Sequence, residues 1–191
     1  MSCYYNEHAQ EFLAGTVNLD MQMHYEPFLK LVPEGGVILD AGCGSGRDSL
    51  AFKKLGYYVV AMDACAEMCQ FAGEYIGQSV YYCRFQDMDF KLNFDGIWAS
   101  ASLLHVPSEE LPAVLRRCAY HLKPNGVLYA SFKYGDFEGE RNGRHFLDLK
   151  EERAEGFFIE AGFKIEEMHV SNDIRPERTN EKWLNILARK I

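Results

Sequence analysis

The sequence predicts an α/β protein of the Rossmann-like, doubly wound type, built on a mostly parallel sheet with helices on both faces. A glycine-rich turn, Asp40-Ala-Gly-Cys-Gly-Ser-Gly46, follows the aliphatic run Val37–Leu39 and precedes a stretch with helical spacing. Further apolar runs alternate with helical stretches along the rest of the chain. Such alternation indicates βαβ units and therefore parallel pairing of the strands.

The first strand, turn and helix predict a ligand site. Glycine stands at every second position of the turn, where it permits positive φ and lets a ligand approach the backbone closely. We expect the loop and the start of the helix over residues 47–55 to present bare backbone N–H groups to an anionic ligand group. The dinucleotide fingerprint G-x-G-x-x-G requires glycine where Arg47 stands, which counts against NAD or FAD. No Gly-Lys-Ser/Thr of a phosphate-binding loop follows.

Two helical stretches, residues 4–13 and 19–31, come before the first strand, and Pro33-Glu-Gly-Gly36 breaks the chain after them. We expect a single domain over residues 1–191, in which residues 1–34 form a helical lid on a Rossmann-like core of residues 35–191. Tyr4 and Tyr5 of the first helix are candidates for contacts with the ligands. Alternatively, they only pack that helix against the core.

The remaining elements follow from apolar runs and their punctuation by glycine and proline. The predicted strands cover residues 57–62, 80–84, 94–100 and 127–132, and a final antiparallel pair covers residues 163–171 and 182–189. The predicted helices cover residues 65–76, 108–122 and 151–161. Residues 135–144 are polar and rich in glycine, and we expect a mobile loop there.

Polar residues that follow these strands are the candidate site residues, because sheets of this type bind ligands at the carboxyl ends of their strands. Asp63 ends the second strand, where a carboxylate can accept hydrogen bonds from both ribose hydroxyls of a nucleotide-like ligand. Alternatively, Asp63 only caps the next helix. His105 follows the fourth strand and is the candidate proton acceptor, although a histidine among apolar residues is also typical of a structural role. Lys133 follows the fifth strand directly.

Composition limits the classes of function. A length of 191 residues fits one domain, and 48% hydrophobic with 25% charged residues is ordinary for a globular protein. No apolar run reaches about 18 residues and the first residues do not resemble a signal peptide, so we expect a cytoplasmic protein without membrane contacts. The six cysteines lack paired ligand spacing, which favours reduced thiols and no metal site. The net charge of −8 counts against nucleic acid as a partner.

The pattern of an acidic residue followed by G-x-G-x-G resembles motif I of the class I S-adenosylmethionine-dependent methyltransferases, and Leu-Lys-Pro-Asn-Gly-Val-Leu128 resembles a late structural motif of this family. The resemblance implies a seven-stranded sheet in the order 3-2-1-4-5-7-6 and S-adenosyl-L-methionine as the cofactor. Asp40 would bind the cofactor's ammonium, Met68 would lean on its adenine, and Asp87 would accept a bond from the adenine amine. Core packing and a solvated loop carboxylate are the alternatives for Met68 and Asp87. The implied cofactor-binding residues are Tyr5, Asp40, Ala41, Gly42, Cys43, Gly44, Arg47, Asp63, Ala64, Met68, Asp87, Met88 and Ala99.

The stretch Cys-Gly-Ser-Gly-Arg-Asp-Ser-Leu50 and the short chain resemble the tellurite-resistance type of small-molecule methyltransferase. We therefore expect methyl transfer to a small, anionic acceptor by a monomer or homodimer, with His105 as the catalytic base. Arginine forks bind oxyanions in bidentate fashion, so the basic residues of the last third of the chain are candidate acceptor ligands. The candidate acceptor-binding residues are Tyr4, Lys133, Arg175 and Arg178. Methylation of tRNA or another RNA, and a catalytically silent cofactor-binding module, are the alternatives.

Overall fold

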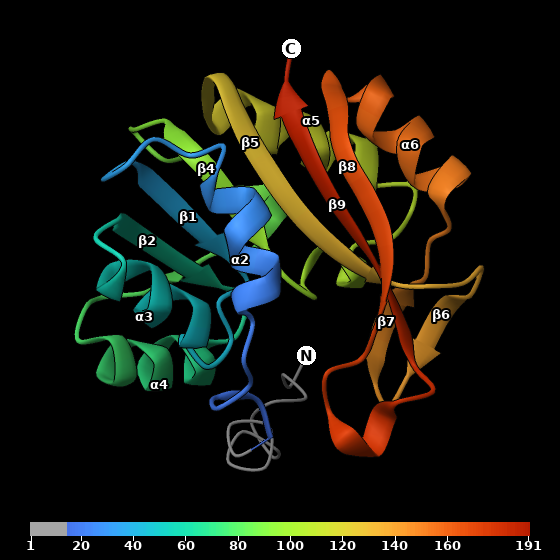
Figure 1. Cartoon of the computed structure of the whole chain (residues 1–191), viewed down its shortest axis with the longest axis horizontal. Coiled ribbons are helices and arrows are strands. Elements are labelled where there is room, and N and C mark those ends of the chain that lie inside the picture. The colour runs from blue at the N-terminus through green and yellow to red at the C-terminus, as the bar shows by residue number, and fades with distance from the viewer. Residues whose placement is uncertain (1–14) are drawn as a thin grey trace.

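A seven-stranded sheet organises the molecule (Figure 1), seen in a computed structural model that describes residues 15–191, apart from the side chain of Pro176. The order across the sheet is β3-β2-β1-β4-β5-β9-β8. Strands β1 to β5 run parallel, and β9 joins antiparallel to both β5 and β8. The strands are β1 (Val37–Ala41), β2 (Tyr58–Asp63), β3 (Tyr81–Tyr82), β4 (Phe94–Ala99), β5 (Leu122–Lys133), β8 (Phe163–Asn172) and β9 (Lys182–Lys190).

This arrangement confirms the predicted fold class. When only the strands of this sheet are numbered along the chain, their order is 3-2-1-4-5-7-6, as expected. Consecutive residues of β1 and β2 alternate between the two faces, and both faces are covered by helices. Residues on both sides of these strands are therefore apolar, which produced the continuous hydrophobic runs in the sequence.

The helices form a layer on each side of the sheet (Figure 1). Ile38 of β1 joins a core cluster with residues of α2 and α3, and Ala61 of β2 packs with residues of α4. Leu39 of β1 faces the other way, into the larger cluster shared with α5 and α6. The helices are α2 (Gln22–Leu29), α3 (Arg47–Lys54), α4 (Ala66–Ile76), α5 (Leu111–His121) and α6 (Glu151–Glu160), and the 3₁₀ turns are η1 (Phe85–Asp87), η2 (Leu103–His105) and η3 (Pro176–Arg178).

Aromatic rings fix α2 and α3 on the sheet. Phe28 of α2 and Phe52 of α3 are fully buried and lie 5.2 and 5.4 Å, between ring centroids, from Trp98 of β4. The Trp98 ring also stacks on Tyr129 of β5 at 3.9 Å. Each such ring buries a large apolar area, so this cluster holds the helices that precede and follow β1 in fixed positions. The glycine-rich turn between β1 and α3 is positioned as a result.

A separate two-stranded hairpin is the main feature that the sequence analysis missed. Strands β6 (Glu138–Arg141) and β7 (Arg144–Leu147) pair antiparallel where a mobile loop was expected, so that expectation is wrong. Their connection, Asn142 and Gly143, has φ of +52° and +72°. Positive φ at both central residues is the signature of the tight type I′ turn, for which Asn-Gly is the preferred sequence. In Figure 1 the hairpin lies beside the lower ends of β8 and β9.

The segment before β1 is described only in part. The predicted helix over residues 4–13, with Tyr4 and Tyr5, lies outside the described residues, and the proposed lid over residues 1–34 stays a prediction. The second predicted helix, residues 19–31, is present as the shorter α2. Within residues 15–191, no helix combines the length and the apolar character needed to cross a membrane.

Candidate functional site

A cavity of about 830 Å³ opens along the carboxyl ends of the parallel strands. Its lining comes from the loops after β1, β2 and β4, from the ends of β5, β8 and β9, and from β7 of the hairpin. The volume is in the range of sites that enclose a ligand of cofactor size. We call the part near the loops after β1 and β2 the cofactor half, and the part near β5, β7, β8 and β9 the acceptor half.

The glycine-rich turn shapes the floor of the cofactor half. Gly42 has φ of +80°, and a Cβ at this position would lie 2.4 Å from the Cβ of Ser102 in the loop after β4. Only glycine therefore lets the two loops approach so closely. The backbone amides of Gly42 and Cys43 donate to the carbonyl of Met62 at 2.8 and 2.9 Å, and that of Gly44 donates to Asp63. The expectation of bare N–H groups is therefore wrong for these three residues, because their amides already donate hydrogen bonds to residues of β2.

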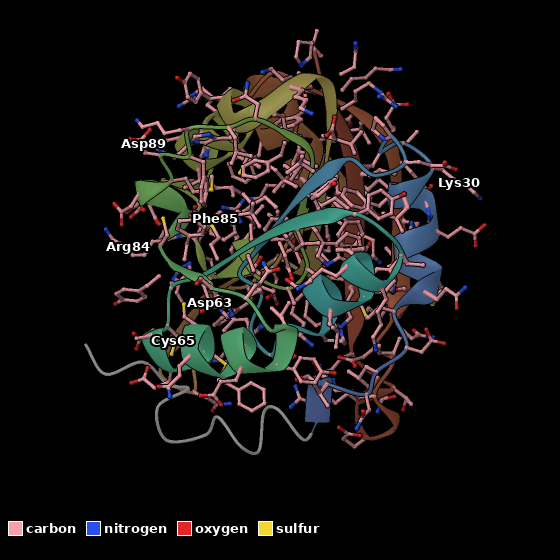
Figure 2. All side chains as sticks on the ribbon, turned by 90° about the vertical axis from the view of Figure 1, so that its left-hand side faces the viewer. Lys30, Asp63, Cys65, Arg84, Phe85 and Asp89 are labelled. Atoms are coloured by element: carbon pink, nitrogen blue, oxygen red, sulfur yellow. The ribbon has the colours of Figure 1, made fainter. Side chains whose placement is uncertain are left out.

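Asp63 lies at the end of β2, beside Cys65 and the start of α4 (Figure 2), and it lines the cavity. Its carboxylate accepts hydrogen bonds from the amides of Gly44 and Cys65, each at 2.9 Å. Burial raises the pKa of Asp63, and the bonds from the backbone act against that rise. A carboxylate has about four lone-pair positions, so the oxygens can accept further bonds from a ligand.

Asp40 does not reach the cavity, which corrects its predicted contact with the cofactor. The side chain is buried, with 2% of its surface exposed, and it accepts a hydrogen bond of 2.6 Å from the hydroxyl of Ser49 in α3. Burial raises the pKa of Asp40 to about 8, and the carboxylate of Asp48 contributes to the rise. Asp40 therefore joins the turn to the helix behind it and does not line the cavity.

Arg47 lines the cavity, but its guanidinium is held by the next residue. Its Nε and a terminal nitrogen donate to the two oxygens of Asp48 at 2.6 and 2.9 Å. Asp48 also accepts bonds from the hydroxyl of Tyr25 at 2.5 Å and from Nε1 of Trp98 at 2.8 Å. Burial raises the pKa of Asp48, but Arg47 and these hydrogen bonds outweigh burial and lower it. This buried network, which the sequence analysis missed, joins α2, α3 and β4 behind the turn.

Several predicted cofactor contacts lie elsewhere. Gly42, Cys43, Gly44 and Ala64 line the cavity as expected. Fully or almost fully buried residues that do not line it are Ala41, Met68, Met88 and Ala99. For Met68 this favours the alternative of core packing. Asp87 is half exposed and pairs with Arg84 at 2.7 Å, outside the cavity lining, which favours its alternative as a solvated carboxylate.

Phe85 and Gln86 take the place expected for Asp87. Both residues line the cofactor half, and Figure 2 shows Phe85 in the short segment that follows β3. The sequence analysis identified the correct loop but selected Asp87, its acidic residue, as the cofactor contact. The aromatic ring of Phe85, two residues earlier in the same 3₁₀ turn, is the side chain that lines the cavity.

His105 lies in η2, directly after β4, and lines the cavity as predicted. Its Nδ1 is 2.7 Å from the carbonyl oxygen of His145 in β7, and the Phe146 ring packs edge-on against it at 4.8 Å. A carbonyl oxygen can only accept, so Nδ1 carries the hydrogen and Nε2 has a free lone pair. Burial lowers the pKa of His105 to about 4, although the bond to His145 works in the other direction. The imidazole is therefore neutral at pH 7.

Three of the predicted acceptor ligands, Lys133, Arg175 and Arg178, line the cavity, but each is paired with an acidic residue, and Tyr4 lies outside the described residues. Lys133 contacts Glu181, lies 3.6 Å from Asp173, and stands over the Trp183 ring at 4.2 Å. Arg175 makes a bidentate pair with Asp173 at 2.8 and 2.5 Å. Arg178 is 3.8 Å from Glu181 and about half exposed. The Arg175 fork that was expected to bind an anionic acceptor thus binds a residue of its own loop, which corrects that expectation.

These pairs balance the charges of Lys133, Arg175 and Arg178, while Arg144 of β7 adds a further cation to the lining of the acceptor half. Asp173 also accepts a bond of 2.9 Å from Nε1 of Trp183. Burial raises the pKa of Asp173, but the bonds from Arg175 lower it by more, so the carboxyl group is ionised. The carboxylates that balance the three paired cations are those of Asp173, Glu177 and Glu181. Among the described residues, no group of three or more His, Cys, Asp or Glu side chains is placed to hold a metal ion.

Known proteins are similar to part of this sequence and to this fold. Residues 38–126 match a family model described as a methyltransferase domain. The ubiquinone biosynthesis O-methyltransferase of Xanthomonas axonopodis pv. citri is 34% identical over 110 residues, which cover 53% of this chain and 45% of that protein. The chain spans about half the length of the curated relatives that it matches first, or slightly less.

Two solved structures illustrate the likeness in fold. One is the 1,6-didemethyltoxoflavin-N1-methyltransferase of Burkholderia thailandensis, with 1,6-didemethyltoxoflavin and S-adenosylhomocysteine bound. The TM-score is 0.78 at 22% identity, over 97% of this chain and 83% of that one. The other is TehB from Haemophilus influenzae, with a TM-score of 0.72 at 17% identity, over 98% of this chain and 67% of that one.

Proposed function

We propose that this chain is a methyltransferase of the class I S-adenosylmethionine-dependent fold. It transfers the methyl group of S-adenosylmethionine to an oxygen or nitrogen of a small acceptor. The observation that carries the proposal is the hydrogen bond from Nδ1 of His105 to the His145 carbonyl. It leaves Nε2 of His105 as a hydrogen-bond acceptor at the carboxyl edge of the sheet, where it can take a proton from an O–H or N–H group.

The residues of the cofactor half suit S-adenosylmethionine. Asp63 offers a carboxylate to the ribose hydroxyls, as the corresponding strand-end acid does in nucleotide sites of this architecture. Phe85 and Gln86 offer a flat surface and an amide beside it. Gly42 lets the loops after β1 and β4 approach each other closely at the floor of the cavity. When bound, the cofactor supplies a methyl group already activated by its sulfonium, so the protein mainly has to orient the acceptor and exclude water.

His105 would act on the acceptor alone. Nε2 of His105 would take the proton that the acceptor oxygen or nitrogen loses when it is methylated. The imidazole can do so because it is neutral and because Nδ1–H is held by His145. A proton acceptor in such a position contributes about 10²- to 10⁴-fold to the rate.

A neutral acceptor fits the acceptor half better than the anionic acceptor expected from the sequence. The cations that were expected to bind an anion are paired with Asp173 and Glu181. A protic, uncharged acceptor needs a base such as His105, whereas an oxyanion has no proton to lose. The names of the relatives, an O-methyltransferase and an N1-methyltransferase, agree with transfer to oxygen or nitrogen of a small molecule.

The experiment that tests this function is a methyl-transfer screen with labelled S-adenosylmethionine across phenols, amines, thiols, oxyanions and tRNA. We expect label in an uncharged phenol or amine and none in tRNA, since the net charge of −8 repels nucleic acid. Label in tRNA would favour the RNA alternative. Binding of the cofactor without transfer to any acceptor would favour a silent cofactor-binding module.

A further inference from the structure

A row of hydrogen-bonded polar side chains forms one wall of the acceptor half. Tyr129 and Ser131 come from β5, Asn185 from β9 and Ser171 from β8, and all four line the cavity. The first three are nearly fully buried, with 4%, 4% and 3% of their surface exposed. Buried polar groups are costly unless they are hydrogen-bonded, so the direction of each bond in this wall can be worked out from its partners.

The orientation of the Asn185 amide is fixed by two backbone carbonyls. Its Nδ2 lies 3.3 Å from the carbonyl oxygen of Trp183 and 3.4 Å from that of His169. Carbonyl oxygens only accept, so the atom that faces them is the nitrogen and not the amide oxygen. The amide oxygen therefore faces Tyr129, whose hydroxyl donates to it at 2.8 Å.

The same reasoning assigns the role of Ser171. Nδ2 of Asn185 donates to the Ser171 hydroxyl oxygen at 2.9 Å, so this oxygen is an acceptor in the pair. The hydroxyl hydrogen of Ser171 is thus left over, and among residues 15–191 it has no acceptor. Because Ser171 lines the cavity, the wall presents a hydrogen-bond donor to whatever occupies the acceptor half.

His24 adds a second unused group to this wall. It lines the cavity with 6% of its surface exposed, and its ring centroid is 6.3 Å from that of Tyr129. Nδ1 of His24 is buried and has no hydrogen-bond partner among the described residues. The rings of His105, Phe146 and Trp183 line the same half. The acceptor half thus combines flat apolar surfaces with unused hydrogen-bonding groups.

We propose that the Ser171 hydroxyl, held by the Asn185 amide that Tyr129 in turn orients, binds a carbonyl oxygen or ring nitrogen of the methyl acceptor. The acceptor class is then a flat aromatic molecule that carries two groups: the O–H or N–H that is methylated, facing His105, and a hydrogen-bond acceptor that faces Ser171. This inference rests on the proposed function and restricts its small acceptor to one substrate class. Ser171 is a specificity-determining residue in this scheme and takes no part in the proton transfer.

Binding to the S-adenosylhomocysteine-loaded full chain tests the proposal without turnover. The probes are 2-, 3- and 4-hydroxyacetophenone, each compared by calorimetry with the ethylphenol that has the same substitution pattern and a CH₂ in place of the carbonyl. A neutral hydrogen bond changes affinity about fivefold, so the matched isomer of hydroxyacetophenone should bind about fivefold more tightly than its ethylphenol. Ser171→Ala should abolish this difference and Ser171→Thr, which keeps the hydroxyl, should retain it. The exposed Ser79→Ala is the matched control and should behave as wild type.

The results separate this inference from the proposed function. A preference that survives Ser171→Ala, or wild-type protein that binds no hydroxyacetophenone more tightly than its partner, would overturn the role of Ser171. The proposed function is measured independently, as transfer of label from S-adenosylmethionine. It fails if no acceptor is labelled, whatever the binding preference, and it stands if label is transferred to phenols that Ser171 does not distinguish.

Discussion

His105 shows how the surroundings of a single residue decide its chemistry. Burial keeps it neutral, and the bond from Nδ1 to the His145 carbonyl leaves the lone pair on Nε2. Arg175 shows the opposite case, since its fork is occupied by Asp173. Both residues were candidates from their place in the sequence, but only the structure shows which polar atoms are already bound. Partners as distant along the chain as His145 from His105 could not be predicted from the local sequence.

At the residue scale, we expect Asp63→Ala to weaken binding of S-adenosylhomocysteine. The carboxylate faces the cavity, and removal of charged hydrogen bonds to two hydroxyls should cost roughly 1.5–3 kcal/mol. Calorimetry measures the change, with Asp87→Ala as the matched control because Asp87 lies outside the cavity and pairs with Arg84. Unchanged affinity in Asp63→Ala, or an equal loss in Asp87→Ala, would remove Asp63 from the cofactor site.

The lowered pKa of His105 predicts a dependence of stability on pH. In the unfolded chain a histidine binds a proton near pH 6.5, whereas folded His105 does so only near pH 4. Between these values the unfolded state holds more protons, so stability falls as the pH falls through this window. From about pH 7 to about pH 5, His105 alone should lower the free energy of unfolding by about 1–2 kcal/mol.

Urea unfolding of wild type and His105→Gln at both pH values measures this contribution. The variant should lose less stability on acidification than wild type, because glutamine does not titrate. Equal losses in the two proteins would show that folded His105 titrates as in the unfolded chain, and that burial does not hold it neutral.

At the scale of elements, the hairpin of β6 and β7 completes the site. It supplies the carbonyl that fixes His105 and the Phe146 ring that packs against it. Within the hairpin, Arg141 of β6 makes a bidentate pair, at 2.9 and 2.7 Å, with the buried Asp148, which directly follows β7. Glu138, at its start, accepts a bond of 2.8 Å from the amide of Ser108. The bond to Ser108 and the bond from His105 to His145 hold the hairpin against the segment that carries His105.

A shortened hairpin tests this role. Glu138 and Leu147 are directly paired, so residues 139–146 can be replaced by Asn-Gly, which closes a two-residue turn between them. The buried Leu147 stays in place. We expect the variant to fold and to bind S-adenosylhomocysteine as wild type does, because the cofactor half is untouched, but to lose most of its methyl transfer. Calorimetry and labelled transfer are measured on the same sample. Full transfer by the shortened chain would show that the hairpin does not position His105.

The sequence predicted the regular elements well and the hairpin badly, for a physical reason. Strands β1 and β4 are buried on both faces and read as apolar runs, while the strands of the hairpin read Glu-Gly-Glu-Arg141 and Arg-His-Phe-Leu147. Their stability comes from contacts with η2 and from single ion pairs. Their sequences therefore lack the alternating apolar pattern that predicts a strand. The Asn142-Gly143 turn was the one local signal, and its positive φ values agree with it.

At the scale of the whole molecule, the order of strands brings the site together. The parallel core places the ends of β1, β2 and β4 side by side, and the antiparallel β9 brings the ends of β8 and β9 to the same edge. The position of the cavity and the presence of Asp63 and His105 in its lining could therefore be predicted from the sequence. The pairing of Arg175 with Asp173 and the burial of Asp40 could not, because both depend on side-chain contacts that the strand pattern does not determine.

The most direct test of the proposed function compares wild type with His105→Asn in two measurements. One is the rate of methyl transfer to the acceptor found in the screen, and the other is the affinity for S-adenosylhomocysteine. We expect kcat to fall by about 10²- to 10⁴-fold, since asparagine cannot take the proton, while the affinity stays within about twofold of wild type. His169→Asn, a half-exposed histidine that does not line the cavity, is the control. Undiminished transfer by His105→Asn would contradict the assignment of His105 as the base, and absence of transfer by wild type to any acceptor would contradict the proposed function itself.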